Sequence, residues 1–514
     1  MNPDVPDPID VFAPLLGARV VTDAERRRRY EIPERGEAGH TPAALLPQTE
    51  AEVGAILRLC NTHGIALVIC GGRTGLVEAQ RPEGEVVLSL ERLNRPLRFD
   101  LADGRAFDFP VDGNADSQRE ALFAWWQGLG RPALADATVT TRAGVAVDAI
   151  NDLLEPLGLM WPMEMGSSSS ASVGGCVANA SAGANAVCYG TAAQMSEAAW
   201  GFWGDSAAAG PCSAPPWIAP PADRLAIDSA RVDPDHGLVG SQGALGVITR
   251  VRLRTYARPA QREAVLLPVD DMPAAMRVLA AARAAFPGDV EEFEFIGRGA
   301  MRLLRLYLGA GFRLPFEQDP DASYYLLLQV KSQDAQADLA GYLYSFLADT
   351  LQWPEMRIGY GPLPMLKKLR HSITESSNAR MRALGGGRLS FDTATPVAVF
   401  GDYLAQLERE LRAASADIEF IAFGHAGVGG AHLHLLGTRE HPVAARAAEL
   451  IGIVFDVTLR FGGTFSAEHG IGTKWAREFQ RRAPQTVRDA LLAAKNRHDP
   501  RRILNPRSFG IPAS

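Results

Sequence analysis

The sequence is short of the features that mark several classes of protein. Its five cysteines include no pair with Cys-x-x-Cys spacing, which argues against a disulfide framework and against an iron–sulfur site. No apolar run is long enough to cross a bilayer, and the acidic, proline-rich amino terminus has neither the basic nor the apolar region of a secretory signal. The net charge of -7 gives no excess of positive charge for nucleic acid. We therefore expect a cytoplasmic protein that does not bind nucleic acid, and we leave peripheral contact with a membrane open.

Length and composition indicate a globular protein with more than one domain. The chain has 514 residues, of which 47% are hydrophobic and 22% charged, as in ordinary folded domains. From about residue 260 the chain changes from glycine-rich loops to alternating strand-like and helix-like stretches, which predicts a second, α+β domain. The expected divisions are a helical lead-in over residues 1–40, a first domain over 41–258 with insertions near 102–134 and 205–236, a second domain over 259–495, and a tail over 496–514.

Hydrophobic periodicity predicts individual helices and strands in both domains. Thr49 and Glu52 have the spacing of a capping box at the start of a helix that stops at Gly64. Elsewhere the pattern predicts strands over 65–70, 85–90, 137–143, 264–268 and 324–330, and helices over 147–154, 272–285 and 334–350.

Residues 163–183 have an unusual composition. They include six serines and four glycines, and almost nothing large or charged after Glu164. Such residues bury little apolar area, so the segment is not expected to form a core. It is either a flexible linker or a loop whose backbone lies against a ligand. Val173 and Val177 argue against a linker, but composition alone leaves both interpretations open.

A glycine-rich turn, Gly71-Gly-Arg-Thr-Gly75, follows directly on the predicted strand over 65–70. A strand that enters such a turn is typical of a cradle for an anion, because bare backbone N–H groups can approach it closely. The turn is neither a Walker A motif nor a Gly-x-Gly-x-x-Gly motif, and many ordinary turns have a similar composition. A second loop of small residues, 239–248, also enters a predicted strand.

Five of the ten histidines lie between residues 425 and 469. His425 precedes a glycine-rich turn, and His432 and His434 follow it on one face of a predicted strand, because strand side chains alternate. Further on, Glu468 stands beside His469. Two or three histidines with a carboxylate suit a divalent metal such as zinc, manganese or iron. The alternative is a set of solvated strand histidines that bind no metal.

Arg370 and Thr374 are four residues apart in a predicted helix and therefore share a face. An arginine fork binds carboxylates through two parallel hydrogen bonds, which suits the binding of an acid substrate. A surface helix with local ion pairs is the alternative.

Taken together, these segments resemble the FAD-binding oxidoreductases of the vanillyl-alcohol oxidase type. Among them the chain is most similar to the FAD-linked D-2-hydroxyacid dehydrogenases, which include D-lactate, glycolate and D-2-hydroxyglutarate dehydrogenases. The resemblance extends from about residue 41 to residue 507. The segments that carry it are, in chain order, 46–53, 70–76, 172–180, 189–190, 240–248, 466–472 and 503–506.

The resemblance implies a two-subdomain FAD-binding domain over 41–258, an α+β substrate-binding cap domain over 259–495, and a tail that packs back on the FAD-binding domain. It also implies FAD that is bound without a covalent link, because residues 70–76 and 163–183 contain no histidine. The residues expected to bind FAD are Gly71, Gly72, Arg73, Thr74, Gly75, Leu76, Gly166, Ser168, Gly174, Gly175, Asn179, Gly243, Val247 and Asn505.

The implied reaction is the oxidation of a D-2-hydroxy acid to the 2-oxo acid. By resemblance, His425, His432 and Glu468 would bind the metal, His469 would take the hydroxyl proton, and Arg370 and Thr374 would hold the carboxylate while hydride passes to flavin N5. The implied partners are a small hydroxy acid and an electron acceptor such as a quinone, an electron-transfer flavoprotein or a cytochrome, and a homodimer is left open. Two alternatives also stay open: a degenerate, non-catalytic flavoprotein subunit of a dehydrogenase complex, and a flavin oxidase on the same fold.

The chain departs from the family pattern at several positions. Val428 and Gly430 replace an aspartate and an asparagine of the histidine motif, and His434 stands where an asparagine is common. Ser390, with Arg388 nearby, replaces a lysine, and Gln242 replaces a common glutamate. We expect these changed positions to shape the substrate site.

Overall fold

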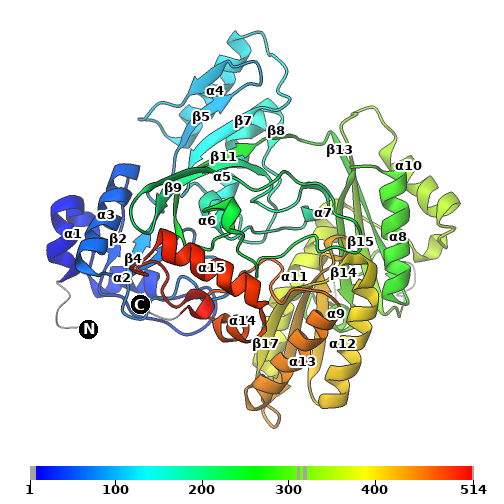
Figure 1. Ribbon diagram of the computed structural model, residues 1–514. Coiled ribbons are helices and arrows are strands. Elements are labelled where there is room, and N and C mark those ends of the chain that lie inside the picture. The colour runs from blue at the N-terminus through cyan, green and yellow to red at the C-terminus, as the bar shows by residue number, and fades with distance from the viewer. Residues whose placement is uncertain (1–6, 310–312, 317–320, 512–514) are drawn as a thin grey trace.

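The computed structural model describes residues 7–309, 313–316 and 321–511; residues 1–6 and 512–514, at the ends of the predicted lead-in and tail, lie outside the described residues. Helices and strands alternate along the chain, which confirms the predicted α+β class. Figure 1 shows two sheets in the first half of the chain, at the left and the top, and a third sheet with its helices at the right. The predicted strands and helices form within a few residues of their expected ends, with the exceptions given below.

The lead-in is helical but also contributes a strand. Helices α1 (Pro8–Leu16) and α2 (Ala24–Glu31) flank β1 (Val20–Val21), which pairs with β2 (Ala44–Leu45) and so becomes the edge of the first sheet. The order of this sheet is β1-β2-β4-β3, with β4 at Val86–Ser89 and β3 at Leu67–Cys70. Between β2 and β3 runs α3 (Glu50–His63), whose capping box of Thr49 and Glu52 is confirmed.

The second sheet is antiparallel and includes parts of both predicted insertions. The insertion near 102–134 holds its edge strand and helix α4 (Ala115–Gly128), whose Trp125 packs edge-on against Phe99. Within the predicted insertion over 205–236, residues 208–212 form a strand that pairs with a neighbouring strand. In spatial order the strands are β10 (Ala208–Cys212), β9 (Ser196–Trp203), β11 (Gly246–Arg254), β7 (Thr138–Arg142), β5 (Pro96–Asp100) and β6 (Ala106–Asp108).

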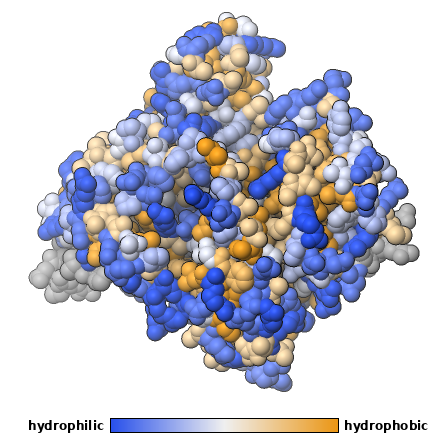
Figure 2. Space-filling view, turned by 45° about the vertical axis from the view of Figure 1, so that its right-hand side comes forward, coloured by the Kyte–Doolittle hydropathy of each residue, from blue (hydrophilic) through white to orange (hydrophobic). Residues whose placement is uncertain are grey.

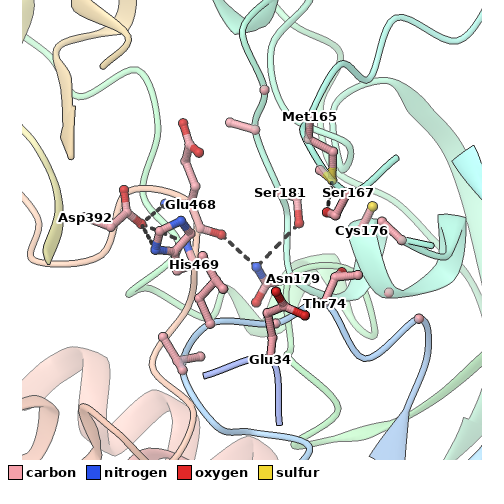
Figure 3. Close-up of a pocket in the computed structure, with 18 of the residues that line it drawn as sticks. Glu34, Thr74, Met165, Ser167, Cys176, Asn179, Ser181, Asp392, Glu468 and His469 are labelled. Carbon is pink, nitrogen blue, oxygen red and sulfur yellow. Dashed lines mark hydrogen bonds and ion pairs between the residues drawn. The ribbon is translucent and has the colours of Figure 1, made fainter. Parts of the chain in front are cut away.

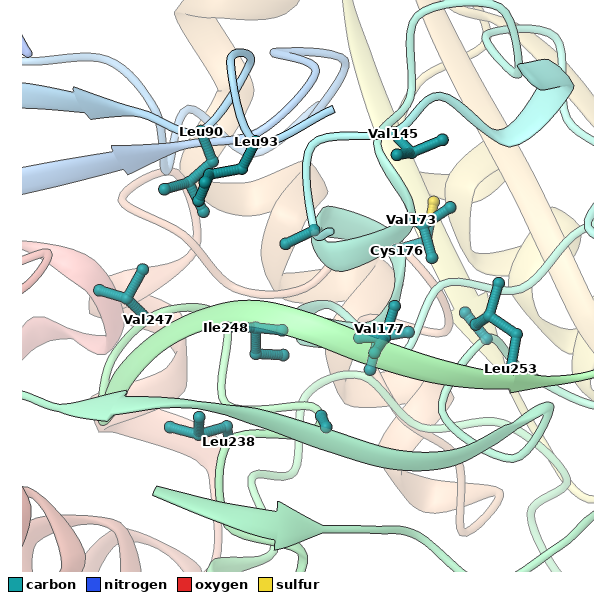
Figure 4. Close-up of a cluster of buried hydrophobic side chains, with 14 of the residues drawn as sticks. Leu90, Leu93, Val145, Val173, Cys176, Val177, Leu238, Val247, Ile248 and Leu253 are labelled. Carbon is teal, nitrogen blue, oxygen red and sulfur yellow. The ribbon is translucent and has the colours of Figure 1, made fainter. Parts of the chain in front are cut away.

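Residues 163–183 are neither a linker nor merely a loop. Ser172 caps a short helix, α6 (Val173–Ala178), by accepting a hydrogen bond from the Gly175 N–H. Val173, Cys176 and Val177 are buried in the main core of the first half. Figure 4 shows Val177 between α6 and β11, the strand that carries Ile248 and Leu253. The expectation that this segment adds nothing to a core is therefore wrong, because its few apolar residues lie on one helix face.

The third sheet forms the second half of the molecule and has helices on both faces. Helices α8 (Met272–Ala285), α12 (Phe400–Ala414) and α13 (Ala447–Arg460) share one apolar cluster with one face, and α9 (Arg298–Tyr307) and α11 (Leu363–Leu384) share another with the opposite face. The strand order is β16 (Gly359–Tyr360), β13 (Gln261–Val269), β15 (Tyr324–Ser332), β14 (Val290–Gly297), β18 (Glu419–Gly424), β19 (Gly430–Thr438) and β17 (Gly385–Ala394).

The predicted helix over 334–350 begins later than expected. Helix α10 covers Leu339–Ser345 and continues as a π-helical turn to Thr350. Asp338 accepts a hydrogen bond from the Gly341 N–H and so sets the start of the helix, which leaves the residues before it in a turn. No helix in the described ranges is long and apolar enough to span a bilayer. On the face shown in Figure 2, hydrophilic residues predominate around the margin, and hydrophobic residues gather mainly toward the middle.

The end of the chain returns to the first sheet. After α15 (Gln485–His498), the Leu67 N–H donates to the Ile503 carbonyl at 2.6 Å, and Leu504 forms a bridge with Leu67. A buried ion pair holds this turn: Lys495 Nζ lies 2.7 Å from Asp499 Oδ2, and Asp499 also accepts the N–H groups of residues 503 and 504. The pair therefore fixes the path of the tail toward Asn505.

Replacing Lys495 with methionine would leave the Asp499 carboxylate buried without its cation. We expect the free energy of unfolding to fall by about 3–5 kcal/mol, the usual effect of removing one partner of a buried pair. Urea unfolding followed by circular dichroism measures the change. Arg412→Met is the matched control, because its pair with Glu408 is exposed on α12 and should contribute less than about 1 kcal/mol. An equal loss of unfolding free energy in the two variants would contradict the conclusion that the buried Lys495–Asp499 pair stabilises this turn.

Candidate functional site

A cavity of about 550 Å³ lies between the two halves of the molecule. Glycine-rich segments of the first half line one side, and the histidine-bearing strands of the third sheet, with α11, line the other. Figure 3 shows residues of both sides, with Thr74, Ser167 and Cys176 on one and Asp392, Glu468 and His469 on the other. The structure therefore brings together segments that are up to several hundred positions apart in the sequence.

All but one of the residues expected to bind FAD line this cavity. The exception is Ser168, which does not line the cavity. Its N–H donates to the Met165 carbonyl and its carbonyl accepts from the Asp148 N–H, so its backbone is tied into a turn beside α5 (Val147–Leu154). The adjacent Ser167 lines the cavity instead. Runs of identical residues have no periodicity that could have distinguished the two.

The glycines allow two loops to pack backbone against backbone. A Cβ atom on Gly72 would lie 1.9 Å from the Ser170 carbonyl oxygen, and one on Gly174 would lie 2.4 Å from Ala143 Cβ. Ser172 Oγ accepts hydrogen bonds from the N–H groups of both Gly72 and Gly175, at 3.2 and 3.3 Å. The 71–76 turn and the start of α6 thus form one continuous wall.

The backbone of this wall fits an anionic group. Within the described part of the chain, the N–H groups of Arg73, Thr74, Gly75 and Leu76 form no hydrogen bonds, although all four residues line the cavity. Four successive unpaired donors in residues that line a cavity are suited to phosphate oxygens. The chemistry of the cradle therefore fits the pyrophosphate of FAD.

Asn505 completes the wall from the far end of the chain. Its Oδ1 accepts the Ile69 N–H at 2.9 Å, and its Nδ2 donates to the Gln242 carbonyl at 3.1 Å. Gln242 in turn accepts the Ile471 N–H and donates to the Ser229 carbonyl. These bonds join β3, the 239–248 loop and the loop that carries Glu468.

On the opposite wall, strand pairing brings the predicted metal ligands together. His425 directly follows β18, His432 lies on β19, and the two Nε2 atoms are 3.3 Å apart. Glu468 Oε1 lies 3.2 Å from His425 Nε2. The ligand atoms of His425, His432 and Glu468 all lie within 4.8 Å of one another. The structure thus assembles these three predicted residues into one group.

The group fits a divalent cation. Glu468 Oε1 is buried and forms no hydrogen bond with a described residue, although it faces two imidazole nitrogens. Burial raises the pKa of Glu468 to about 7, and burial followed by repulsion from His425 lowers the pKa of His432 well below its usual range. A cation among these atoms would relieve the burial of the carboxylate, and two nitrogens with one oxygen suit zinc, manganese or iron.

Glu294, on β14, orients His425 from behind. Its carboxylate contacts His425 Nδ1, so that Nε2 points toward the other ligands, and its second oxygen accepts from Arg370 Nε. Burial alone would raise the pKa of Glu294, but Arg370 and His425 outweigh it and lower the pKa to about 2. A carboxylate behind a histidine ligand is a common way to fix the ring and its tautomer.

Asp392, on β17, supports His469 as Glu294 supports His425. Its Oδ2 accepts the N–H groups of Glu468 and His469, at 2.7 and 2.8 Å, and lies 3.6 Å from His469 Nδ1. Its Oδ1 lies 3.7 Å from His432 Nδ1. Burial lowers the pKa of His469 more than Asp392 raises it. Asp392 therefore places a neutral imidazole beside the metal-ligand group, and its contacts appear in Figure 3.

Arg370 and Thr374 also line the cavity, one turn apart on α11. Arg370 uses Nε for Glu294, and its two Nη groups form no hydrogen bond within the described ranges. The helix is therefore not a surface helix with local pairs only, since Arg370 is largely buried and can still offer two donors to a ligand.

The changed motif positions divide into two groups. Val428 and Gly430 do not line the cavity, so the expectation that they shape the substrate site is wrong. Val428 is buried in a small apolar cluster with Val187 and Ile227. Ser390, His434 and Gln242 do line the cavity.

Several cavity residues carry no recognisable sequence motif. Lys367 Nζ lies 2.7 Å from Glu164 Oε1 and 2.6 Å from Glu292 Oε1, and so connects the two walls. Glu292 and Glu294 are charged residues in a buried strand. Because a buried carboxylate needs a partner, this pattern could have indicated from the sequence that they belong to a site. Arg35 and Lys474 also line the cavity, and nothing in their sequence context indicates it.

Comparison with known proteins agrees with this arrangement. The family model for the C-terminal domain of FAD linked oxidases matches residues 258–509, and that for an FAD binding domain matches residues 41–107 and 131–199. The interruption between these last two ranges contains α4.

Curated relatives match over nearly the whole chain. A D-2-hydroxyglutarate dehydrogenase of Xanthomonas citri pv. viticola is 27% identical over 473 residues, which cover 90% of this chain and 88% of the relative. That of Stutzerimonas stutzeri is 24% identical over 509 residues and 95% of both chains. The mitochondrial enzyme of Bos taurus is 25% identical over 511 residues, 97% of this chain and 82% of the relative.

Solved structures share the fold at low sequence identity. The structure of p-cresol methylhydroxylase with substrate bound has a TM-score of 0.66 and 15% identity, over 98% of this chain and 96% of that one. Alkyldihydroxyacetonephosphate synthase has a TM-score of 0.62 and 14% identity, over 97% and 84%. With both halves of the chain matched in the family's order, the protein belongs to the FAD-linked D-2-hydroxyacid dehydrogenase family and is an FAD-dependent oxidoreductase that acts on a CH–OH group.

Proposed function

We propose that this protein oxidises a D-2-hydroxy acid to the 2-oxo acid, with FAD bound non-covalently and a divalent cation held by His425, His432 and Glu468. The observation that carries the proposal is the buried Glu468 Oε1, which forms no hydrogen bond with a described residue and lies 3.2 Å from His425 Nε2 and close to His432, beside His469 in the same cavity as the glycine-rich wall. When bound, FAD supplies the acceptor for the hydride, and the cation favours loss of the substrate hydroxyl proton.

The first-half wall supports binding of FAD without a covalent bond. The unpaired N–H groups of Arg73, Thr74, Gly75 and Leu76 would hold the pyrophosphate, and the donors need no side-chain charge to do so. Within the described part of the chain, none of the residues that line this wall is a histidine.

His469 would take the hydroxyl proton of the substrate. Asp392 holds the Nδ1 side of the ring, which leaves Nε2 as the atom that accepts the proton. Because burial lowers the pKa of His469, the imidazole is neutral near pH 7 and able to act as a base. Asp392 would then stabilise the imidazolium that forms.

Arg370 and Thr374 would hold the substrate carboxylate. Glu294 fixes the Arg370 Nε side of the guanidinium, so that the remaining Nη donors point to a constant position. The same carboxylate also positions His425, so the carboxylate and hydroxyl of the substrate would be located by two residues that share one support.

Replacing His469 with asparagine removes the base and keeps a polar side chain of related shape. We expect the rate of flavin reduction to fall by about 10²–10⁴-fold, while the protein stays yellow with its normal FAD content. Anaerobic bleaching of the flavin with a panel of D-2-hydroxy acids measures the rate. An unchanged rate would overturn the role of His469. If no acid bleaches the wild-type flavin, the proposed function itself is wrong.

Removing the metal should separate its role from that of FAD. Dialysis against a chelator, or Glu468→Gln, is expected to lower the metal content and slow bleaching by at least about tenfold, without loss of FAD. Metal analysis and flavin absorbance are measured on the same sample. His441→Gln is the control, because His441 is exposed and lies outside the cavity. This variant should keep the metal content of the wild type. Full activity in metal-free protein would exclude a catalytic cation.

A further inference from the structure

Two cations, Arg35 and Lys474, line one end of the cavity, and a third, Arg388, lies two residues before the cavity-lining Ser390 on the same face of its strand. Arg35 belongs to the segment after α2, Arg388 lies on β17, and Lys474 follows the loop that carries Glu468 and His469. The proposed reaction leaves all three cations without a role.

None of the three is paired with a carboxylate in the described part of the chain. Lys474 Nζ donates to the Ser390 carbonyl at 3.2 Å and lies 4.5 Å from the centre of the Trp475 ring. Arg388 Nη1 donates to the Asn378 amide oxygen at 2.7 Å. Arg35 forms neither a hydrogen bond nor an ion pair with any described residue. The positive charge at this end of the cavity is therefore not neutralised by an ion pair.

The nearest carboxylates are used elsewhere or face solvent. Glu78 pairs with Arg81 at 3.3 Å, and Asp392 accepts the backbone N–H groups of residues 468 and 469. Glu34 borders the cavity but is an exposed residue, and it forms no ion pair with Arg35. Lys474 is exposed to solvent at the rim and Arg35 and Arg388 are partly buried, so an anion bound among the three would replace water as the partner of their charges.

Repulsion within the cluster shows that the three charges act on one another. Burial, followed by repulsion from Arg35, lowers the pKa of Lys474 to about 8. Burial and then Arg35 lower the pKa of Arg388 to about 10. Like charges that depress each other in this way gain from an anion placed among them.

The cluster lies at a distance from His469 that suits the length of a small substrate. Ser390 and Asp392 point to the same side of β17 and are about 7 Å apart along the strand. Asp392 supports His469, and Lys474 contacts Ser390. Arg370 lies on the other side of the metal-ligand group, where its partner Glu294 is on β14, separated from β17 by two strands. The cavity thus offers positive charge at both ends and the base between them.

We propose that Arg35, Arg388 and Lys474 form a second anion subsite, so that the preferred D-2-hydroxy acid carries a second anionic group at the end of its side chain. This inference rests on the proposed function. The first carboxylate would lie at Arg370, the hydroxyl at the metal-ligand group and His469, and the second anion at Lys474. The spacing along β17 favours roughly two or three carbons between the hydroxyl-bearing carbon and the second anion.

The test compares acids that differ only in the second charge. D-2-Hydroxyglutarate and D-2-hydroxyvalerate have the same number of carbons, and D-3-phosphoglycerate and D-glycerate form a second pair that distinguishes phosphate from carboxylate. For the wild type we expect kcat/KM to favour the charged member of one pair by at least about tenfold. Lys474→Met and Arg388→Met should lower that preference at least about tenfold through KM, with little change for the neutral acid.

Two matched variants make the result specific. Lys474→Arg keeps the charge and should keep most of the preference, and Lys368→Met removes one lysine from the exposed side of α11, outside the cavity, and should leave the preference unchanged. FAD content and circular dichroism are measured for every variant. Loss of FAD in Lys474→Met, an equal loss for charged and neutral acids, or no preference in the wild type would each overturn the subsite. Failure of every acid to bleach the wild-type flavin would overturn the proposed function instead.

Discussion

The hydrogen bonds that Asp392 accepts from the N–H groups of Glu468 and His469 are the constraint on which the site depends. One buried carboxylate on β17 places a metal-ligand candidate and a base candidate at the same time, although both come from a loop more than seventy positions later. Asp392 also faces His432 on the neighbouring strand, so the same side chain fixes the position of the loop relative to the sheet. Asp392 thus holds the backbone of Glu468 next to the strand that carries His432.

The site is also organised by where charge is left unbalanced. In the centre, the Glu294, Asp392 and Glu468 carboxylates surround three imidazoles, and one oxygen of Glu468 forms no hydrogen bond with a described residue. Toward β17 the excess is positive, with Arg35, Arg388 and Lys474 unmatched by carboxylates in the described ranges. If the centre binds a cation and this end an anion, as we propose, a bound hydroxy acid would have a single favourable direction. Such an orientation would bring one Cα–H bond toward the flavin side of the cavity.

Much of this could be predicted from local sequence, and the reason is physical. Some features depend on only a few neighbouring residues, so their spacing in the sequence is enough to predict their geometry. These are the capping box of Thr49 and Glu52, the 71–76 turn, and the alternation of His432 and His434. Glu294, Arg35 and Lys474 reach the cavity only through strand order and long loops, which local patterns do not encode. Local sequence also could not distinguish Ser168 from Ser167, because only contact with the residues near Asp148 decides which of the two lines the cavity. The strand at 208–212 likewise exists only because β9 offers an edge.

The return of the tail to β3 has a consequence for how the protein is made. Asn505 joins Ile69 to Gln242, so the cofactor wall of the first half is incomplete until residues near the end of the chain are in place. The Lys495–Asp499 pair that directs the tail is equally late in synthesis. On the ribosome, the glycine-rich loops emerge hundreds of residues before the segment that ties them together. A chain cut before Asn505 would lack these two hydrogen bonds, and with them the link between β3 and the 239–248 loop that closes the glycine-rich wall.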